Sequence, residues 1–152
     1  MTDPLSLCAC AAEQVPLELL LEADPDEQAV ARYQLDCQAY VAQQAGRVVA
    51  ACLLRPQADG RWELMNIATL PDTQGQGVGS ELLRFAIAQA RDAGAKVLFL
   101  GTGTFGYQLA FYQRQGFRVT ALERDHFLDH YPEPIFEQGI QHKDRLILSL
   151  SL

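Results

Sequence analysis

The sequence is short of basic residues. Its 152 residues include 12 Lys or Arg and 19 Asp or Glu, which gives a formal net charge of −7. General binding to nucleic acid depends on lysine and arginine side chains that displace counterions from phosphates, so this composition argues against a nucleic-acid partner. An acidic surface permits a cationic substrate, although acidity alone identifies none.

Long apolar runs are also missing. No window approaches the roughly 18 consecutive apolar residues that span a bilayer. The first four residues, Met1-Thr2-Asp3-Pro4, lack the basic region of a secretory signal. We therefore expect a cytoplasmic protein without a membrane partner.

The four cysteines show no paired spacing typical of metal ligands. They are interpreted as small apolar side chains in a reducing compartment, and no metal site is predicted. The residues concerned are Cys8, Cys10, Cys37 and Cys52.

About half of the chain (49%) is hydrophobic, which is enough for the core of a single domain spanning residues 1–152. Period-two alternation and short apolar runs indicate strands, whereas apolar residues three and four apart indicate helices. Strands are predicted at 5–12, 37–44, 47–55, 61–70, 96–101, 117–122 and 142–150, and helical segments at 16–34, 77–93 and 107–115, with a mixed segment at 125–138.

The order of these elements predicts an α/β (α+β) fold with a mixed, mostly antiparallel sheet of about seven strands and flanking helices. Turn signals at Ala45-Gly46 and Asp59-Gly60 join three strands into an antiparallel meander. Strand 61–70, helix 77–93 and strand 96–101 then form one βαβ unit, expected to cross over right-handed.

The most informative segment is residues 74–80, Gln-Gly-Gln-Gly-Val-Gly-Ser, which opens a helix directly after a strand. Its glycines lack a Cβ, so their N–H groups can approach an anion closely. The first N–H groups of a helix have no intrahelical partner, and the helix dipole adds about half a positive charge there. The loop can therefore bind a pyrophosphate, although a glycine-rich strand-to-helix turn without a ligand has the same pattern.

Two other phosphate motifs compete with this interpretation. A P-loop ends in Gly-Lys-Ser/Thr, but Ser80 follows Gly79 directly and the loop has no lysine, so NTP hydrolysis is disfavoured. Residues 101–106, Gly-Thr-Gly-Thr-Phe-Gly, match the dinucleotide fingerprint G-x-G-x-x-G. Only 46 residues follow them, too few for the further βαβ steps usual in a dinucleotide-binding domain. Dinucleotide binding is kept as a minor alternative.

The pattern Gln74-x-x-Gly77-x-Gly79, followed by an amphipathic helix, resembles the acyl-CoA signature of the GNAT superfamily of N-acetyltransferases. A second block, Phe111-Tyr112-Gln113-Arg114-Gln115-Gly116-Phe117, resembles the helix-to-strand block of that family. Two departures stand out. The loop has no cation, because Gln74 and Gln76 occupy positions that are often basic, and residues 104–107 lack the asparagine that often precedes the tyrosine helix.

The resemblance implies that acetyl-CoA is the co-substrate. In this family the strand before the loop splays at a bulge, and its backbone pairs with the pantetheine arm and polarises the thioester carbonyl. The residues that the resemblance assigns to the cofactor are Ile67, Ala68, Thr69, Gln74, Gly75, Gln76, Gly77, Val78, Gly79 and Ser80.

Two residues are candidates for the chemistry of transfer. Tyr112 matches the position that the family often uses as general acid toward the thiolate of CoA, although such tyrosines also serve to position the sulfur. Glu63 is the candidate general base, because the family often uses a carboxylate on this strand as base, and alternation places Glu63 on one face with Met65 and Ile67, with Asn66 opposite. A solvated glutamate is the alternative. Asp125, His126 and Asp129, in the variable tail, are further candidates for lining the acceptor site.

The function predicted by the resemblance is transfer of an acetyl group from acetyl-CoA to an amine of a small cationic molecule by direct attack, since binding both substrates together supplies proximity. A protein or peptide N-acetyltransferase and a non-catalytic acyl-CoA-binding module are the alternatives. The identity of the acceptor, the acyl-chain preference and the oligomeric state stay open, and a homodimer is among the alternatives.

Overall fold

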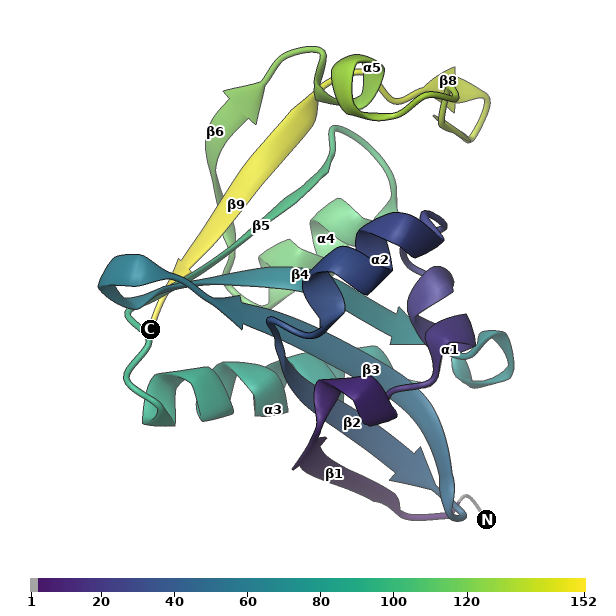
Figure 1. Ribbon diagram of the computed structural model, residues 1–152, viewed down its shortest axis with the longest axis vertical. Helices are drawn as coiled ribbons and strands as arrows, with labels where there is room; N and C mark the ends of the chain where they lie inside the picture. Colours follow the sequence, from purple (N-terminus) through teal and green to yellow (C-terminus); the bar gives the residue numbers. More distant parts are fainter. Residues whose placement is uncertain (1–2) are drawn as a thin grey trace. The chain divides into compact units, whose positions relative to one another are not determined.

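The computed structural model describes residues 3–152 and comprises two units (Figure 1). The first unit runs to Leu98 and includes Leu152, and the second spans Phe99–Ser151. The boundary falls within one strand, β5 (Val97–Gly103), which begins in the first unit and continues into the second.

A four-stranded antiparallel sheet forms the centre of the first unit. Neighbouring strands pair in sequence order, and the two turn signals predicted the pairing of the last three strands. Ala45 and Gly46 have φ of 53° and 74°, the left-handed conformation that a tight hairpin requires at both central residues. The strands are β1 (Leu5–Cys10), β2 (Gln38–Gln44), β3 (Arg47–Pro56) and β4 (Arg61–Thr69).

Two short helices, α1 (Leu17–Leu21) and α2 (Glu27–Gln34), cover one face of this sheet. The Asp24-Pro25-Asp26 break separates them, and the Asp26 side chain caps α2 by accepting a hydrogen bond from the Ala29 N–H at 3.1 Å. One-turn 3₁₀ segments lie at Ala12–Gln14, Ala58–Gly60 and Pro71–Thr73. The core on this face contains Leu19, Leu20, Val30 and Tyr33 from the helical side and Ala39, Val41, Ala51, Leu53 and Ala68 from the sheet.

The opposite face is covered by α3 (Val78–Asp92), the helix that follows the glycine loop. Its Phe85 ring meets Tyr40 of β2 edge-on, with centroids 6.1 Å apart, whereas Val41, the next residue of β2, belongs to the core on the α1–α2 face. The helix ends before Gly94, whose φ of 93° suits a C-terminal cap, as predicted. Its buried apolar stripe consists of Val78, Leu82, Leu83, Ala86, Ile87 and Ala90.

The second unit contains three longer strands in the order β5, β9 (Arg145–Ser151), β6 (Arg118–Glu123). Helix α4 (Tyr107–Arg114) connects β5 to β6. The mixed segment at 125–138 contains the one-turn helix α5 (His126–His130) and the first strand of a small hairpin, β7 (Phe136–Glu137) paired with β8 (Ile140–Gln141).

The predicted fold class is confirmed: a mostly antiparallel sheet of seven strands with flanking helices. Several boundaries differ from the prediction, among them those of β9 and β5. The last strand begins at Arg145 instead of residue 142, because 142–144 lead out of the β7–β8 hairpin. Strand β5 continues to Gly103, so the first half of the second glycine motif is extended strand.

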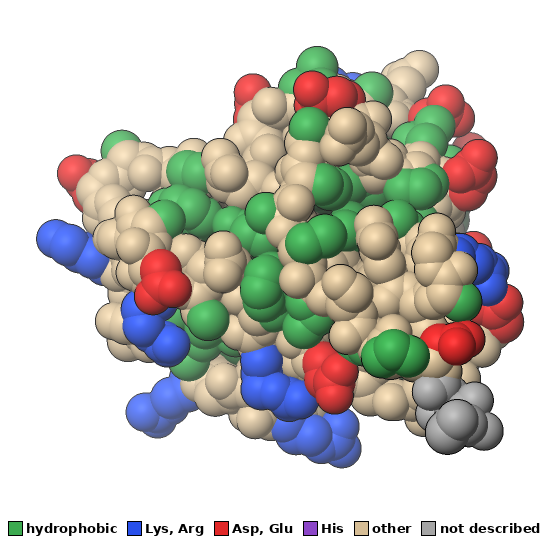
Figure 2. Space-filling view, turned by 90° about the horizontal axis from the view of Figure 1, so that it is seen from below, with side chains coloured by type: hydrophobic (Ala, Val, Ile, Leu, Met, Phe, Trp, Pro, Cys, Tyr) green, Lys and Arg blue, Asp and Glu red, His purple; other side chains and the backbone are tan. Residues whose placement is uncertain are grey.

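Across residues 3–152, no helix is both long enough and apolar enough to span a bilayer. In the face shown in Figure 2, charged side chains of both signs lie mainly around the periphery, and the centre is occupied by apolar and uncharged groups.

Candidate functional site

The glycine loop begins where β4 is stopped. The Leu70 N–H donates to the Val49 carbonyl at 2.9 Å, and Pro71 then opens a one-turn 3₁₀ segment, closed by the Thr73 N–H donating to the Leu70 carbonyl at 2.9 Å. Gln74 returns to extended backbone, and its side-chain Nε2 donates to the Thr69 carbonyl at 3.0 Å. Gln74 therefore ties the first residue of the loop to the end of the strand.

Backbone conformation explains why positions 75 and 77 of the loop are glycine. Gly75 and Gly77 have φ of 79° and 81°, and a Cβ built on either would meet nothing within 4 Å. An L-residue is strained in this left-handed region, so glycine is favoured although the space around both positions is open.

The N-terminus of α3 is left without a side-chain cap. Its N-cap residue is Gly77, and the first helical bond runs from the Glu81 N–H to the Gly77 carbonyl at 3.1 Å. The N–H groups of the first turn, from Val78 to Ser80, therefore have no partner within the helix. Together with the helix dipole, they form a site suited to an anion such as a phosphate.

One cation does lie beside the loop, although none lies within it. Arg47, at the start of β3, forms an ion pair with Asp72 at 3.1 Å, and the Thr73 hydroxyl donates to Asp72 at 2.9 Å. The Thr73 hydrogen bond and the Arg47 guanidinium lower the pKa of Asp72. Sequence spacing offered no sign of this, because Arg47 and Asp72 are 25 residues apart and meet only through the pairing of β3 with β4.

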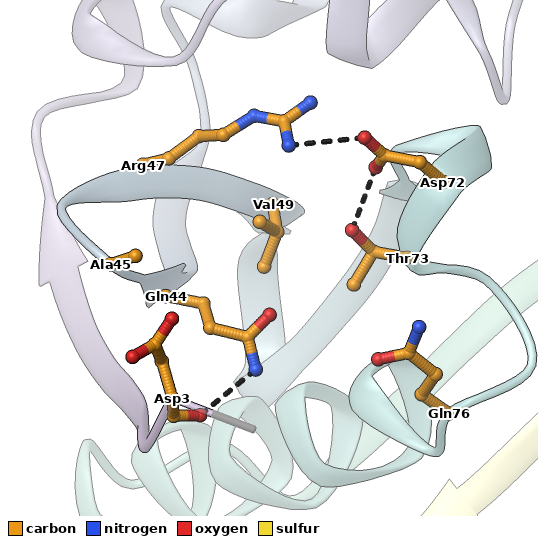
Figure 3. Close-up of a pocket in the computed structure, with 8 residues that line it drawn as sticks. All are labelled: Asp3, Gln44, Ala45, Arg47, Val49, Asp72, Thr73 and Gln76. Atoms are coloured by element: carbon orange, nitrogen blue, oxygen red, sulfur yellow. Dashed lines mark hydrogen bonds and ion pairs between the residues drawn. The ribbon is translucent and has the colours of Figure 1, made fainter. Parts of the chain in front are cut away.

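An open pocket of about 360 Å³ separates the β2–β3 turn from the glycine loop. In Figure 3, Arg47 reaches across to Asp72 along one side, and Gln76 of the loop lies on the far side. The pocket is lined by Asp3, Gln44, Ala45, Arg47, Val49, Asp72, Thr73 and Gln76.

The strand that precedes the loop contains a β-bulge. Leu54 lies opposite Leu64 and Leu53 lies opposite Asn66, so Met65 is the extra residue. Beyond the bulge the ladder is regular again and pairs residues 67–69 with 50–52. A bulge in this strand agrees with the expectation from the family, and the backbone of 67–69 is in regular register with β3.

The bulge overturns the predicted grouping of side chains on β4. Glu63 pairs with Arg55 and Ile67 pairs with Cys52. Cross-strand partners share a face, and positions three apart on a strand face opposite ways. Glu63 and Ile67 therefore lie on opposite faces of the sheet, and the prediction that they share one is wrong.

The same register corrects the placement of Asn66. Its partner Leu53 is two residues from Arg55, so Asn66 lies on the same face as Glu63 instead of opposite it. The inserted residue reverses the alternation expected for an unbroken strand.

Glu63 is held by two neighbouring side chains. Its Oε1 accepts from Arg55 at 2.8 Å and from Gln57 at 2.9 Å. The Glu63 side chain is 16% exposed and that of Arg55 is 34% exposed. The carboxylate is therefore half of a partly buried ion pair, an environment that sequence alternation did not reveal.

Asn66 joins three elements of the first unit. Its Nδ2 donates to the Leu20 carbonyl at 3.0 Å and to the Tyr33 hydroxyl at 3.1 Å, and that hydroxyl donates to Asp24 at 3.0 Å. Burial raises the pKa of Tyr33. The Oδ1 of Asn66 is buried and has no hydrogen-bond partner within residues 3–152. This network connects β4 to α1 and α2, and sequence reasoning missed it.

Tyr112 lies on α4 in the second unit and is 7% exposed. Its ring is packed edge-on between Phe111, at a centroid distance of 5.2 Å, and Phe117, at 5.9 Å. Its carbonyl accepts hydrogen bonds from the N–H groups of Gln115 and Phe117 at 3.0 and 3.3 Å. These contacts fix the ring and the end of the helix together.

The second glycine motif accommodates protein side chains. A Cβ at Gly101 would lie 2.6 Å from Cδ of Arg145, and one at Gly103 would collide with the His142 ring. At Gly106, where φ is 110°, a Cβ would lie 2.6 Å from Glu137. The tail of the chain therefore accounts for these three glycines, which leaves the dinucleotide interpretation without support.

The chain matches the model of the acetyltransferase (GNAT) family over residues 10–117. The chain belongs to the GNAT family. An uncharacterized N-acetyltransferase, YvbK of Bacillus subtilis (strain 168), is 38% identical over 136 residues, which cover 89% of this chain and 88% of that protein. The predicted family and enzyme class, an N-acetyltransferase, are thereby confirmed.

Solved structures agree with the GNAT assignment. An IAA acetyltransferase from Bacillus cereus ATCC 14579 is 38% identical, with a TM-score of 0.92 over 98% of this chain and 100% of that chain. A GNAT family acetyltransferase from Elizabethkingia anophelis, solved with acetyl-CoA bound, is 34% identical, with a TM-score of 0.92 over 97% of this chain and 98% of that chain.

Proposed function

We propose that this GNAT protein transfers an acetyl group from acetyl-CoA to the amine of a small cationic molecule by direct attack. The observation that carries the proposal is the uncapped N-terminus of α3, where the left-handed Gly77 exposes backbone donors next to the end of β4. The relative from Elizabethkingia anophelis with acetyl-CoA bound supports this choice of acyl donor.

The glycine loop offers both the space and the hydrogen-bond donors that a pyrophosphate needs. Open space above Gly75 and Gly77 leaves room for the oxygens of a ligand, and the N–H groups of residues 78–80 supply donors. The Gln74 side chain stabilises the loop, because its amide already donates a hydrogen bond to the Thr69 carbonyl. The backbone of residues 67–69 is the part of β4 that we assign to the pantetheine arm.

Proton transfers are assigned to two side chains. Attack requires a neutral amine, and the departing thiolate of CoA requires a proton. We assign the second role to the Tyr112 hydroxyl, because a neutral phenol carries a proton that it can donate. Glu63 is assigned the first role, acting on the amine directly or through a water molecule, and its ion pair with Arg55 keeps its carboxylate in one orientation.

A cationic acceptor is inferred from charge. The chain has a net charge of −7, and the tail exposes Asp125 and Asp129 on either side of the start of α5. Acidic groups attract a cationic substrate and raise its local concentration.

The test is release of CoA thiol from acetyl-CoA against a panel of acceptors. The panel contains a diamine, the matched neutral monoamine of equal chain length, an amino acid and a peptide with a free N-terminus. Turnover that is at least tenfold more efficient, by kcat/KM, with the diamine than with the monoamine is the expected result. Preference for the peptide would replace the small-molecule proposal with a protein N-acetyltransferase. Binding of acetyl-CoA in calorimetry without turnover on any acceptor would leave only a binding module.

A further inference from the structure

The second unit exposes an edge strand that carries apolar side chains. All six residues of β6 are exposed, and among them Val119 is 49% and Leu122 is 56% exposed. Within the sheet order β5, β9, β6, this strand is outermost, and Figure 1 shows it on the outer side of β9. An edge of this kind presents unpaired backbone groups to any strand of matching pattern.

A bulge places the two apolar side chains on one face. Val119 lies opposite Leu148 and Leu122 lies opposite Leu146, with Thr120 as the extra residue between them. Since Leu146 and Leu148 are two apart on β9, their partners on β6 point to the same side. In a strand without the bulge, residues 119 and 122 would face opposite ways.

The remaining side chains of β6 lie on the other face. Arg118 pairs with Ser149 and Glu123 pairs with Arg145, four residues apart on β9, so the two charges share a side. Thr120 belongs to this side as well, because its hydroxyl lies 3.0 Å from that of Ser149. The strand thus has an apolar face and a face with one charge of each sign at its ends.

We propose that two copies of this chain associate through β6, paired antiparallel about a two-fold axis between residues 120 and 121. This register puts Arg118 opposite Glu123 of the second copy and Val119 opposite Leu122, and each pair meets on its own face. In this register opposite charges pair, apolar side chains pair, and both members of each pair lie on the same face of the joined sheet. The strand is therefore complementary to itself, as a two-fold interface requires.

Registers shifted by one residue form less favourable side-chain pairs. A shift of one residue in one direction would place Arg118 opposite Arg124, and like charges directly opposite are destabilising. A shift in the other direction would place Arg118 opposite Leu122. Glu123 already accepts a hydrogen bond from Arg145, but its side chain is 44% exposed and remains accessible to a second arginine.

Sedimentation equilibrium on the full chain tests the dimer directly. We expect a mass twice that of the monomer at micromolar concentrations and at least a tenfold weaker dimer for Leu122→Asp. Leu128→Asp is the matched control, because Leu128 lies on α5, is 45% exposed and is not part of β6. A monomeric wild-type chain at 200 µM, or equal weakening by both substitutions, would overturn the proposal.

The register has its own test. In the double variant Val119→Cys/Leu122→Cys, each new cysteine lies opposite the other in the partner, whereas the two within one chain are about 10 Å apart along the strand. Mild oxidation should give a disulfide-linked dimer of the double variant but not of either single variant. Equal cross-linking in a single variant would refute the register. This result does not depend on acetyl transfer, because the readout is mass.

Discussion

Replacing Gly77 by Ala should weaken acetyl-CoA binding far more than it weakens the fold. Gly77 has φ of 81° and ψ of 4°, and a Cβ there meets no protein atom within 4 Å. The cost to the fold is then the left-handed backbone alone, about 1–2 kcal/mol. For a domain of this size, that cost lowers Tm by about 2–8 °C.

The cost to binding is larger because the added methyl group occupies the space that we assign to the pyrophosphate. Loss of one or two hydrogen bonds to a charged ligand removes about 1.5–6 kcal/mol. A loss at the lower end raises Kd for acetyl-CoA about tenfold, and each further 1.4 kcal/mol adds another factor of ten.

A matched control lies at the other end of the same helix. Gly94 has φ of 93° and open space around its Cβ position, so Gly94→Ala carries a similar backbone cost. It lies roughly 25 Å from Gly77 along the helix, at 1.5 Å per residue. Calorimetry with acetyl-CoA and thermal melting separate the two effects. If both variants bind acetyl-CoA as the wild type does, or weaken equally, the loop is not the phosphate site.

Three further changes test the chemistry and the pH response. Tyr112→Phe should lower kcat about tenfold to hundredfold with little change in the KM for acetyl-CoA, since general acids contribute at least that much; an unchanged kcat would remove the acid role. Glu63→Gln should lower kcat/KM for the amine and flatten its pH dependence, and normal kinetics across pH would exclude Glu63 as base. Burial, Arg145 and His130 lower the pKa of His126, so the unfolded chain binds its proton more readily. Stability should therefore fall as pH drops below about 6.5, by at most about 1.4 kcal/mol per pH unit, and His126→Asn should remove this part of the slope in melts.

Much of the fold was predictable because local chemistry and the fold agree. The glycines at 75, 77 and 94 mark backbone conformations that other residues avoid, and the apolar stripe between them predicts α3. The hairpin at Ala45-Gly46 needs two left-handed residues in succession, which limits where the chain can turn.

The candidate site was less predictable because it depends on register and on distant segments. Alternation assumes an unbroken strand, so the extra residue Met65 reversed the predicted facing of Glu63. The motif at 101–106 was ambiguous because a glycine that makes room for a ligand and one that makes room for Arg145 look the same in sequence. Arg47 lies beside the loop only because β3 pairs with β4, and spacing along the sequence does not show this pairing.

The bulge at Met65 also divides β4 into two segments that can change independently. Residues 61–64 belong to the hairpin with β3 and carry the ion pair of Glu63, whereas residues 67–69 lead into the glycine loop. A deletion of one residue within 61–64 can be offset by loss of the extra residue, so that the register from Asn66 onward is kept. The pairing of residues 67–69 with β3 is therefore protected from a change of one residue in this part of the strand.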